Sequence, residues 1–130
     1  MKKVIYISVL AILFFACKKL EYSPEGPTDV RVENLSAQTW YNVIVNTSGG
    51  KDTFDIISPH DTSGYLRFDK AFPKADISAM INGEKYATDS VDYTGMTYIG
   101  QAKITYQVSI LSAQDKKLKI NKVILDSPLD

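Results

Sequence analysis

The residues that could perform catalysis are few, and they centre on one histidine. His60 is the only histidine of the chain, and it stands in the run Ser58-Pro59-His60-Asp61. Serine, histidine and aspartate together can form a hydrolytic triad in which the histidine is the general base. No Gly-x-Ser-x-Gly motif presents a serine as the nucleophile. We therefore interpret His60 as an exposed loop residue and Asp61 as a turn former, and we expect that the protein is not an enzyme.

Metal and cofactor sites also lack a complete set of ligands. Zinc needs several cysteine or histidine ligands, and the chain has one of each. Calcium needs clustered oxygens, and the spacing of Asp52, Asp55 and Asp61 does not match an EF-hand loop. The Gly49-Gly50 pair is not followed by the Gly-Lys of a phosphate-binding loop. We expect no metal and no cofactor, and we interpret these residues as turns and solvated strand positions.

Aromatic residues remain as candidates for ligand contact. The chain has eight tyrosines and one tryptophan, and such side chains suit interfaces because they combine a large apolar area with a polar atom. Flat aromatic faces also stack on sugar rings. Tyr93 and Tyr98 flank the Thr94-Gly95 turn, and we take them as possible ligand-contact residues. The competing interpretation is that β-strands favour aromatic residues for packing.

The first seventeen residues predict where the protein goes. Met1-Lys2-Lys3 precedes an apolar run, Val4 to Phe15, of about twelve residues, whereas a bilayer-spanning helix needs about twenty. A charged start and a short apolar core are typical of a secretory signal. The following Ala16-Cys17 resembles the end of a bacterial lipobox. We expect a signal peptide over residues 1–16 and lipidation of Cys17; the alternatives are an uncleaved anchor or a core segment.

The rest of the chain has the size of one domain with a tether. Removing residues 1–16 from the 130-residue chain leaves 114 residues. Pro24 and Pro27 disfavour helix and sheet, so we expect a tether over residues 17–27 and a domain over 28–130. Basic and acidic residues are interleaved without a basic stripe, so we expect no nucleic-acid binding. No second apolar run is long enough to span a membrane, so the lipid is the expected membrane contact.

Alternating apolar residues and turn signals predict strands along the whole domain. The predicted strands cover residues 28–35, 40–47, 51–57, 65–68, 72–81, 84–89, 102–111 and 117–125, with shorter apolar pieces at 91–93 and 96–99. Asn82-Gly83 predicts a hairpin, because a type I′ turn has positive φ at both positions. The alternation changes phase between Ile120 and Val123, which predicts a β-bulge near Asn121-Lys122.

This pattern indicates an all-β domain. No segment shows a helical apolar stripe, and the strands recur about every ten residues, which is typical of sandwiches and barrels. We predict an immunoglobulin-like two-sheet β-sandwich of about seven to nine short strands. The alternative is a small closed β-barrel.

Several stretches of the domain carry a resemblance to known proteins. They are Asn42 to Gly50, Phe68 to Ala75, Ile81 to Tyr86, Asp92 to Gly95, and the closing hairpin from Lys103 to Leu125. These stretches resemble a family of small, uncharacterised lipoproteins from Bacteroidota. The resemblance covers nearly the whole domain. It implies a lipid-anchored β-domain, and it implies no activity.

Two kinds of function follow as expectations. The lipid anchor, the short tether and the lack of catalytic residues favour a binding or accessory subunit of a cell-envelope complex. The tyrosines favour, as the alternative, a surface carbohydrate-binding module, and a hydrolase that uses His60 ranks last. The expected partners are therefore the membrane and an envelope protein or a glycan. We expect attachment to the outer membrane, because Lys18 rather than aspartate follows Cys17.

Overall fold

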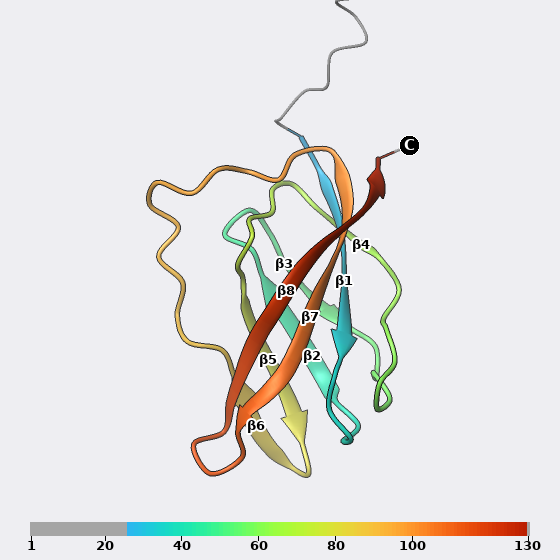
Figure 1. Cartoon of the computed structure of the whole chain (residues 1–130), viewed down its shortest axis with the longest axis vertical. Helices are drawn as coiled ribbons and strands as arrows, with labels where there is room; N and C mark the ends of the chain where they lie inside the picture. Colours follow the sequence, from blue (N-terminus) through green and yellow to red (C-terminus); the bar gives the residue numbers. More distant parts are fainter. Residues whose placement is uncertain (1–25, 130) are drawn as a thin grey trace, which may run out of the picture.

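A computed structural model describes residues 26–129 (Figure 1). The expected signal peptide, Cys17 and most of the tether lie outside the described residues. Eight strands form the described part: β1 (Thr28–Asn34), β2 (Tyr41–Asn46), β3 (Lys51–Phe54), β4 (Leu66–Phe68), β5 (Asp76–Ile81), β6 (Glu84–Ala87), β7 (Ala102–Ser112) and β8 (Lys117–Pro128). Within this part, no helix has the length and apolar character needed to cross a membrane.

The eight strands belong to one mixed sheet that is nearly closed into a barrel (Figure 1). The strand order is β3-β2-β5-β6-β8-β7-β1-β4, with parallel pairing between β1 and β7 and between β6 and β8. The two edge strands approach each other: Phe54 of β3 stacks on Phe68 of β4 with ring centroids 6.4 Å apart. Gly49 and Lys70 form an isolated bridge beside them. The prediction of a two-sheet sandwich was therefore wrong, and the predicted alternative, a small barrel, is closer to the structure.

The physical reason for the error is that the sheet contains two groups of four strands. The group β3-β2-β5-β6 is antiparallel throughout, and the group β8-β7-β1-β4 packs its apolar residues against it. Each group has the alternating inward and outward residues that one sheet of a sandwich would have. A single parallel pair, Ala87 with Lys117, joins them. Alternation along a strand predicts which residues face inward, but it does not predict that one residue pair connects the two groups into a single sheet.

The core lies inside the curved sheet and is built from the apolar residues that alternate along its strands. Trp40 and Tyr106 are the largest of the fully buried side chains. Ile77, Ala79 and Ile81 of β5 are buried together, because every second residue of a strand lies on the same face. On β7, Ile104, Tyr106 and Val108 are all fully buried, and Ile110, the next residue on this face, is partly buried against the core. Full burial of a large apolar side chain contributes about 1.5–3 kcal/mol relative to exposure.

Local features of the strands agree with the sequence in two places. Asn82 and Gly83 have φ values of 52° and 79°, which confirms the type I′ hairpin between β5 and β6. In the β7–β8 ladder, Gln107 pairs with Lys122 and Val108 pairs with Ile120. Asn121 is therefore an extra residue in β8, and the predicted bulge is confirmed.

Other boundaries differ from the predictions. The strand predicted from residue 72 begins only at Asp76, and β3 ends at Phe54 rather than at residue 57. The apolar pieces at 91–93 and 96–99 belong to no strand; they lie in the long connection between β6 and β7. In that connection apolar side chains pack from a loop, so their burial does not require ladder pairing. β8 continues to Pro128, three residues beyond the predicted end at 125.

Candidate functional site

His60 lies in an exposed turn, as the sequence predicted. Its φ of 60° places the backbone in the left-handed region, and the turn is closed by a hydrogen bond from Asp61 N–H to Ser58 O of 3.1 Å. The Asp61 carboxylate accepts from Thr62 N–H at 2.8 Å. Within residues 26–129, no hydrogen bond or ion pair joins His60 to a serine hydroxyl or a carboxylate. The geometry of this turn therefore offers no activated nucleophile.

The three aspartates considered as calcium ligands do not converge. Asp52 and Asp61 each use a carboxylate oxygen to accept the backbone N–H of the following residue at 2.8 Å. Asp55 is exposed just after β3. In the described part of the chain, no group of three or more histidine, cysteine, aspartate or glutamate side chains is placed to hold a metal ion. Asp52 and Asp61 therefore act locally on the backbone.

Tyr93 and Tyr98 are brought together, but they pack inward on Phe72. Their ring centroids lie 5.0 Å and 5.1 Å from that of Phe72. Tyr93 donates a hydrogen bond to Asn46 O at 3.1 Å, and burial raises the pKa of its hydroxyl, with the charge of Asp76 adding to this. Both rings are half-buried. They therefore fasten the connection between β6 and β7 to the body of the domain.

Lys70 completes this aromatic cluster from the side of β4. Its ammonium group lies 4.7 Å from the ring centroid of Tyr98 and donates to the Tyr98 hydroxyl at 3.0 Å. A cation over an aromatic face is attracted by the negative potential of the ring. Lys70 thus covers one face of the half-buried Tyr98 ring.

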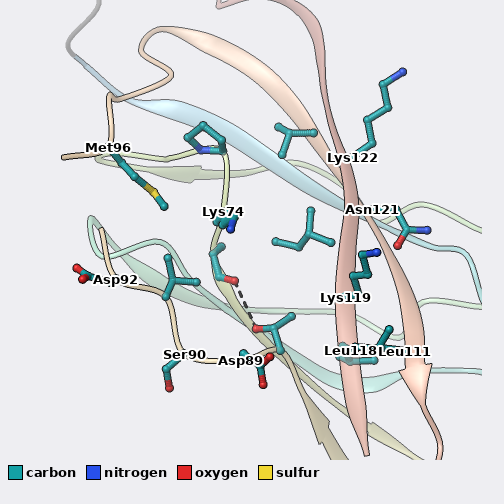
Figure 2. Close-up of a pocket in the computed structure, with 16 residues that line it drawn as sticks. Lys74, Asp89, Ser90, Asp92, Met96, Leu111, Leu118, Lys119, Asn121 and Lys122 are labelled. Atoms are coloured by element: carbon teal, nitrogen blue, oxygen red, sulfur yellow. Dashed lines mark hydrogen bonds between the residues drawn. The ribbon is translucent and has the colours of Figure 1, made fainter. Parts of the chain in front are cut away.

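A cleft of about 680 Å³ lies between β8 and the segments that flank β5 and β6 (Figure 2). One wall is β8 from Leu118 to Val123. The other wall comes from residues 73–75 and 88–92, with Met96 beside them. Thr88 links these two segments, because its N–H bonds to Ile77 O at 2.9 Å and its hydroxyl lies 3.4 Å from Ala75 O. The volume is in the range of small binding sites in proteins.

The cleft exists because the pairing of β6 with β8 stops after one residue pair. Ala87 pairs with Lys117, and the chain then leaves the sheet. Two ion pairs hold this end: Lys116 Nζ to Glu84 Oε2 at 2.8 Å and Lys117 Nζ to Asp89 Oδ1 at 2.7 Å. The hydrogen bonds and charges of these carboxylates raise the pKa of both lysines. From Leu118 on, the described chain supplies β8 with a strand partner on one side only, which is β7.

The inside of the cleft is apolar and its rim is charged. Leu118 is buried, and Ile120 and Val123 pack against the core. Lys119 and Lys122 are exposed, and Figure 2 shows them pointing from β8 away from the opposite wall. The bulge explains the sequence of faces, because the extra residue lets two successive residues point outward before Val123 returns inward.

Charged side chains of both signs line the cleft. Lys74, Lys119 and Lys122 line the cleft, and none of them forms an ion pair with another residue in 26–129. On the opposite wall, Asp89 is already paired with Lys117. The Asp92 carboxylate accepts from Thr94 N–H at 3.0 Å, and this hydrogen bonding lowers its pKa.

A smaller groove of about 310 Å³ lies on the outer face of β2 and β5. Tyr41, which is 48% exposed, lies next to it and pairs with Met80 across a bulge in β2. The groove presents the polar side chains of Asn42, Thr53 and Lys85. The sequence carried a signal for this exposure: Trp40 and Tyr41 are adjacent in a strand, and adjacent side chains face opposite ways.

Comparisons with known proteins show similarity in structure only. The sequence matches no protein-family model and no curated protein. Among solved structures, a protein from Eubacterium rectale determined by NMR aligns with 78% of this chain and 95% of its own length, at 15% identity and a TM-score of 0.49. A likeness of this degree carries no argument about function.

Proposed function

We propose that this protein is a membrane-anchored lipoprotein with a non-catalytic β-domain that acts as a binding or accessory subunit of a cell-envelope complex. The observation that carries this proposal is the cleft beside β8, which has an apolar interior and a charged rim. Natural proteins pair, cover or charge the open edges of their sheets. An edge left open along an apolar cleft is a feature of a surface that receives another molecule.

The anchor defines where such a partner is found. Lipidation of Cys17 attaches the chain to the membrane, and several acyl chains on one residue make the attachment stable. Lys18 and Lys19 follow the lipid directly, where anionic headgroups attract them. The tether of residues 17–27, fully extended, reaches at most about 35–40 Å. The domain therefore meets partners close to the surface of the membrane, which we propose is the outer membrane.

The test is affinity purification of the tagged, lipidated full chain from solubilised envelope, followed by mass spectrometry. The proposal expects a stoichiometric envelope protein in the eluate. A Cys17→Ser chain, which cannot be lipidated, is the control, and we expect it to lose the partner because it is no longer held at the membrane. A lipidated chain that elutes alone, also after crosslinking, would overturn the proposal.

A surface carbohydrate-binding module is the second candidate, and the position of Tyr41 favours it. An exposed aromatic ring beside the polar groups of Asn42, Thr53 and Lys85 combines a stacking face with hydrogen-bonding groups. Calorimetry of the full chain against a panel of envelope polysaccharides tests this function. We expect binding that Tyr41→Ala abolishes and Tyr41→Phe retains. Heats that stay flat for all polysaccharides would exclude it.

A further inference from the structure

We infer that the cleft receives an extended segment of a partner protein, which adds to β8 as a further strand and alternates apolar with acidic residues. This inference rests on the proposed function, because it names the chemistry of the partner that the accessory domain binds. Strand addition at an open sheet edge is a general mode of peptide recognition, in which main-chain hydrogen bonds supply affinity and side-chain pockets supply specificity.

The backbone of β8 lacks a strand partner on the side of the cleft. Beyond Lys117, the described part of the chain pairs β8 with β7 only. In an antiparallel pair, alternate residues direct their N–H and C=O groups away from the partner strand. On β8 these groups point toward the cleft. The six residues from Leu118 to Val123 give an edge of roughly 20 Å at about 3.3 Å per residue. An added strand would pair with this edge.

An apolar side chain of β8, Leu125, remains mostly exposed within residues 26–129. Leu125 pairs with Ile104, which is fully buried in the core. Directly opposed residues of two strands place their side chains on the same face of the sheet. Leu125 is nevertheless 68% exposed. The inner face of β8 is therefore incompletely covered at Leu125, two residues beyond the lining of the cleft, and an added strand that continues past Val123 would cover it.

The outer face of β8 is positively charged beside the position of an added strand. Lys119 and Lys122 point outward from β8 (Figure 2). The outward residues of a neighbouring strand lie about 5 Å from such positions, where opposite charges stabilise the pair and like charges destabilise it. Carboxylates on the added strand match these lysines. The same lysines oppose pairing of β8 with β8 of a second copy, since the four ammonium groups would then lie close together.

The experiment uses the full chain in mild detergent and a synthetic peptide of about seven residues, long enough to span this edge at about 3.3 Å per residue. The peptide alternates valine with glutamate, and a second peptide carries lysine in place of glutamate. Hydrogen exchange read by mass spectrometry measures protection of residues 118–123. We expect the glutamate peptide to protect them and the lysine peptide to bind roughly tenfold more weakly, because it repels both lysines.

The decisive variant is Lys119→Glu combined with Lys122→Glu. We expect it to invert the preference, so that the lysine peptide binds better than the glutamate peptide, which also shows that the variant is folded. A control, Lys51→Glu, makes the same kind of charge change at an exposed position outside both the cleft and the groove, and we expect it to keep the original preference. A glutamate peptide whose alternate amides are methylated cannot form the ladder, and we expect no protection from it.

The outcomes separate this inference from the proposed function. If the envelope partner copurifies but protects residues outside 118–123, or if neither peptide binds, the strand-addition site is wrong and the accessory function stands. If the chain copurifies with nothing yet binds the glutamate peptide with the expected inversion, the site stands and the accessory function is wrong. If residues 118–123 are protected in a concentration-dependent way without peptide, the occupant is a second copy of the chain, and the inference is overturned.

Discussion

Ala87 and Lys117 form the one ladder pair between β6 and β8 in residues 26–129, and this pair joins the two halves of the sheet. The N–H of Ala87 donates to Lys116 O at 3.2 Å. Next to it, Glu84 and Asp89 bind the two lysines at the tip of the β7–β8 hairpin. The closed end of the cleft thus depends on a few contacts at one point. Along residues 118–123, no strand pairing within the described chain crosses the cleft.

Replacing Ala87 with proline tests the importance of this joint. Proline has no N–H to donate to Lys116 O, and its ring is poorly tolerated inside a ladder. We expect the free energy of unfolding to fall by about 1–3 kcal/mol, and hydrogen exchange of residues 118–123 to become faster. Ala87→Ser keeps the N–H and is expected to keep both properties. Equal exchange in the two variants would show that the joint does not hold the cleft.

Gly49→Ala tests the closure of the barrel between β3 and β4. A Cβ at position 49 would overlap the Lys70 Cβ and lie 2.9 Å from its backbone nitrogen, so the bridge between them would have to open. We expect a loss of about 1–3 kcal/mol in chemical denaturation, the usual cost of overpacking. Gly64→Ala is the control, because no atom lies within 4 Å of the added group. A Gly49→Ala domain as stable as the control would contradict this account.

Tyr106 predicts how stability responds to alkaline pH. Its buried hydroxyl donates to Phe72 O at 2.5 Å, and burial raises its pKa far above 10. Below about pH 10 the side chain is neutral in both states and the shift has no effect. Above it the unfolded chain loses this proton while the folded chain keeps it, so stability falls by about 1.4 kcal/mol per pH unit for this residue. Unfolding titrations of Tyr106→Phe should show a correspondingly shallower slope.

The same variant has a cost at neutral pH. Without the hydroxyl, the buried carbonyl of Phe72 loses its donor, and we expect the free energy of unfolding to decrease by about 1–3 kcal/mol. Tyr65→Phe is a suitable comparison, since the Tyr65 hydroxyl donates to Asp126 at an exposed site. An identical loss of unfolding free energy in both variants would mean that burial does not determine how much the Tyr106 hydrogen bond contributes to stability.

Phe72→Ala tests whether Tyr93 and Tyr98 serve packing. Phe72 is 6% exposed and contacts both rings, so its removal is expected to cost about 3–5 kcal/mol and to weaken the near-ultraviolet circular dichroism of the tyrosines. Phe72→Leu retains bulk and should cost less. If Tyr93→Ala and Tyr98→Ala instead keep full stability and abolish partner binding, the two residues are ligand contacts, as the sequence first indicated.

The parts of the fold that the sequence predicted are the local ones. The Asn82-Gly83 turn needs only two residues with positive φ, and the bulge at Asn121 is visible as a change of phase within one strand. The inward faces of β5 and β7 follow from alternation. Each of these features is determined by residues close together in the chain.

The features that could not be predicted depend on residues far apart. The pairing of Ala87 with Lys117 and the approach of Gly49 to Lys70 turn two expected sheets into one, and neither leaves a mark in the local pattern. The cleft beside β8 is defined by a missing strand neighbour, which only the sheet order shows. The packing of Tyr93 and Tyr98 on Phe72 is likewise a contact between residues far apart in the chain. The exposure of Tyr41 beside the buried Trp40 is instead a local feature.

The bulge in β8 also allows the strand to be shortened by one residue without a change in which residues form the core. If Asn121 were deleted, Ile120 would still face inward, Lys122 outward and Val123 inward, because the remaining residues alternate without interruption. The core would keep every member, and the strand would lose the local bend that a bulge introduces. Deleting Asn121 would therefore change the shape of the cleft and remove the hydrogen bond that Ser109 Oγ donates to Asn121 Oδ1, while the buried residues stay the same. The opening of the cleft beside β8 can thus change by the deletion of one residue, without substitution of any core residue.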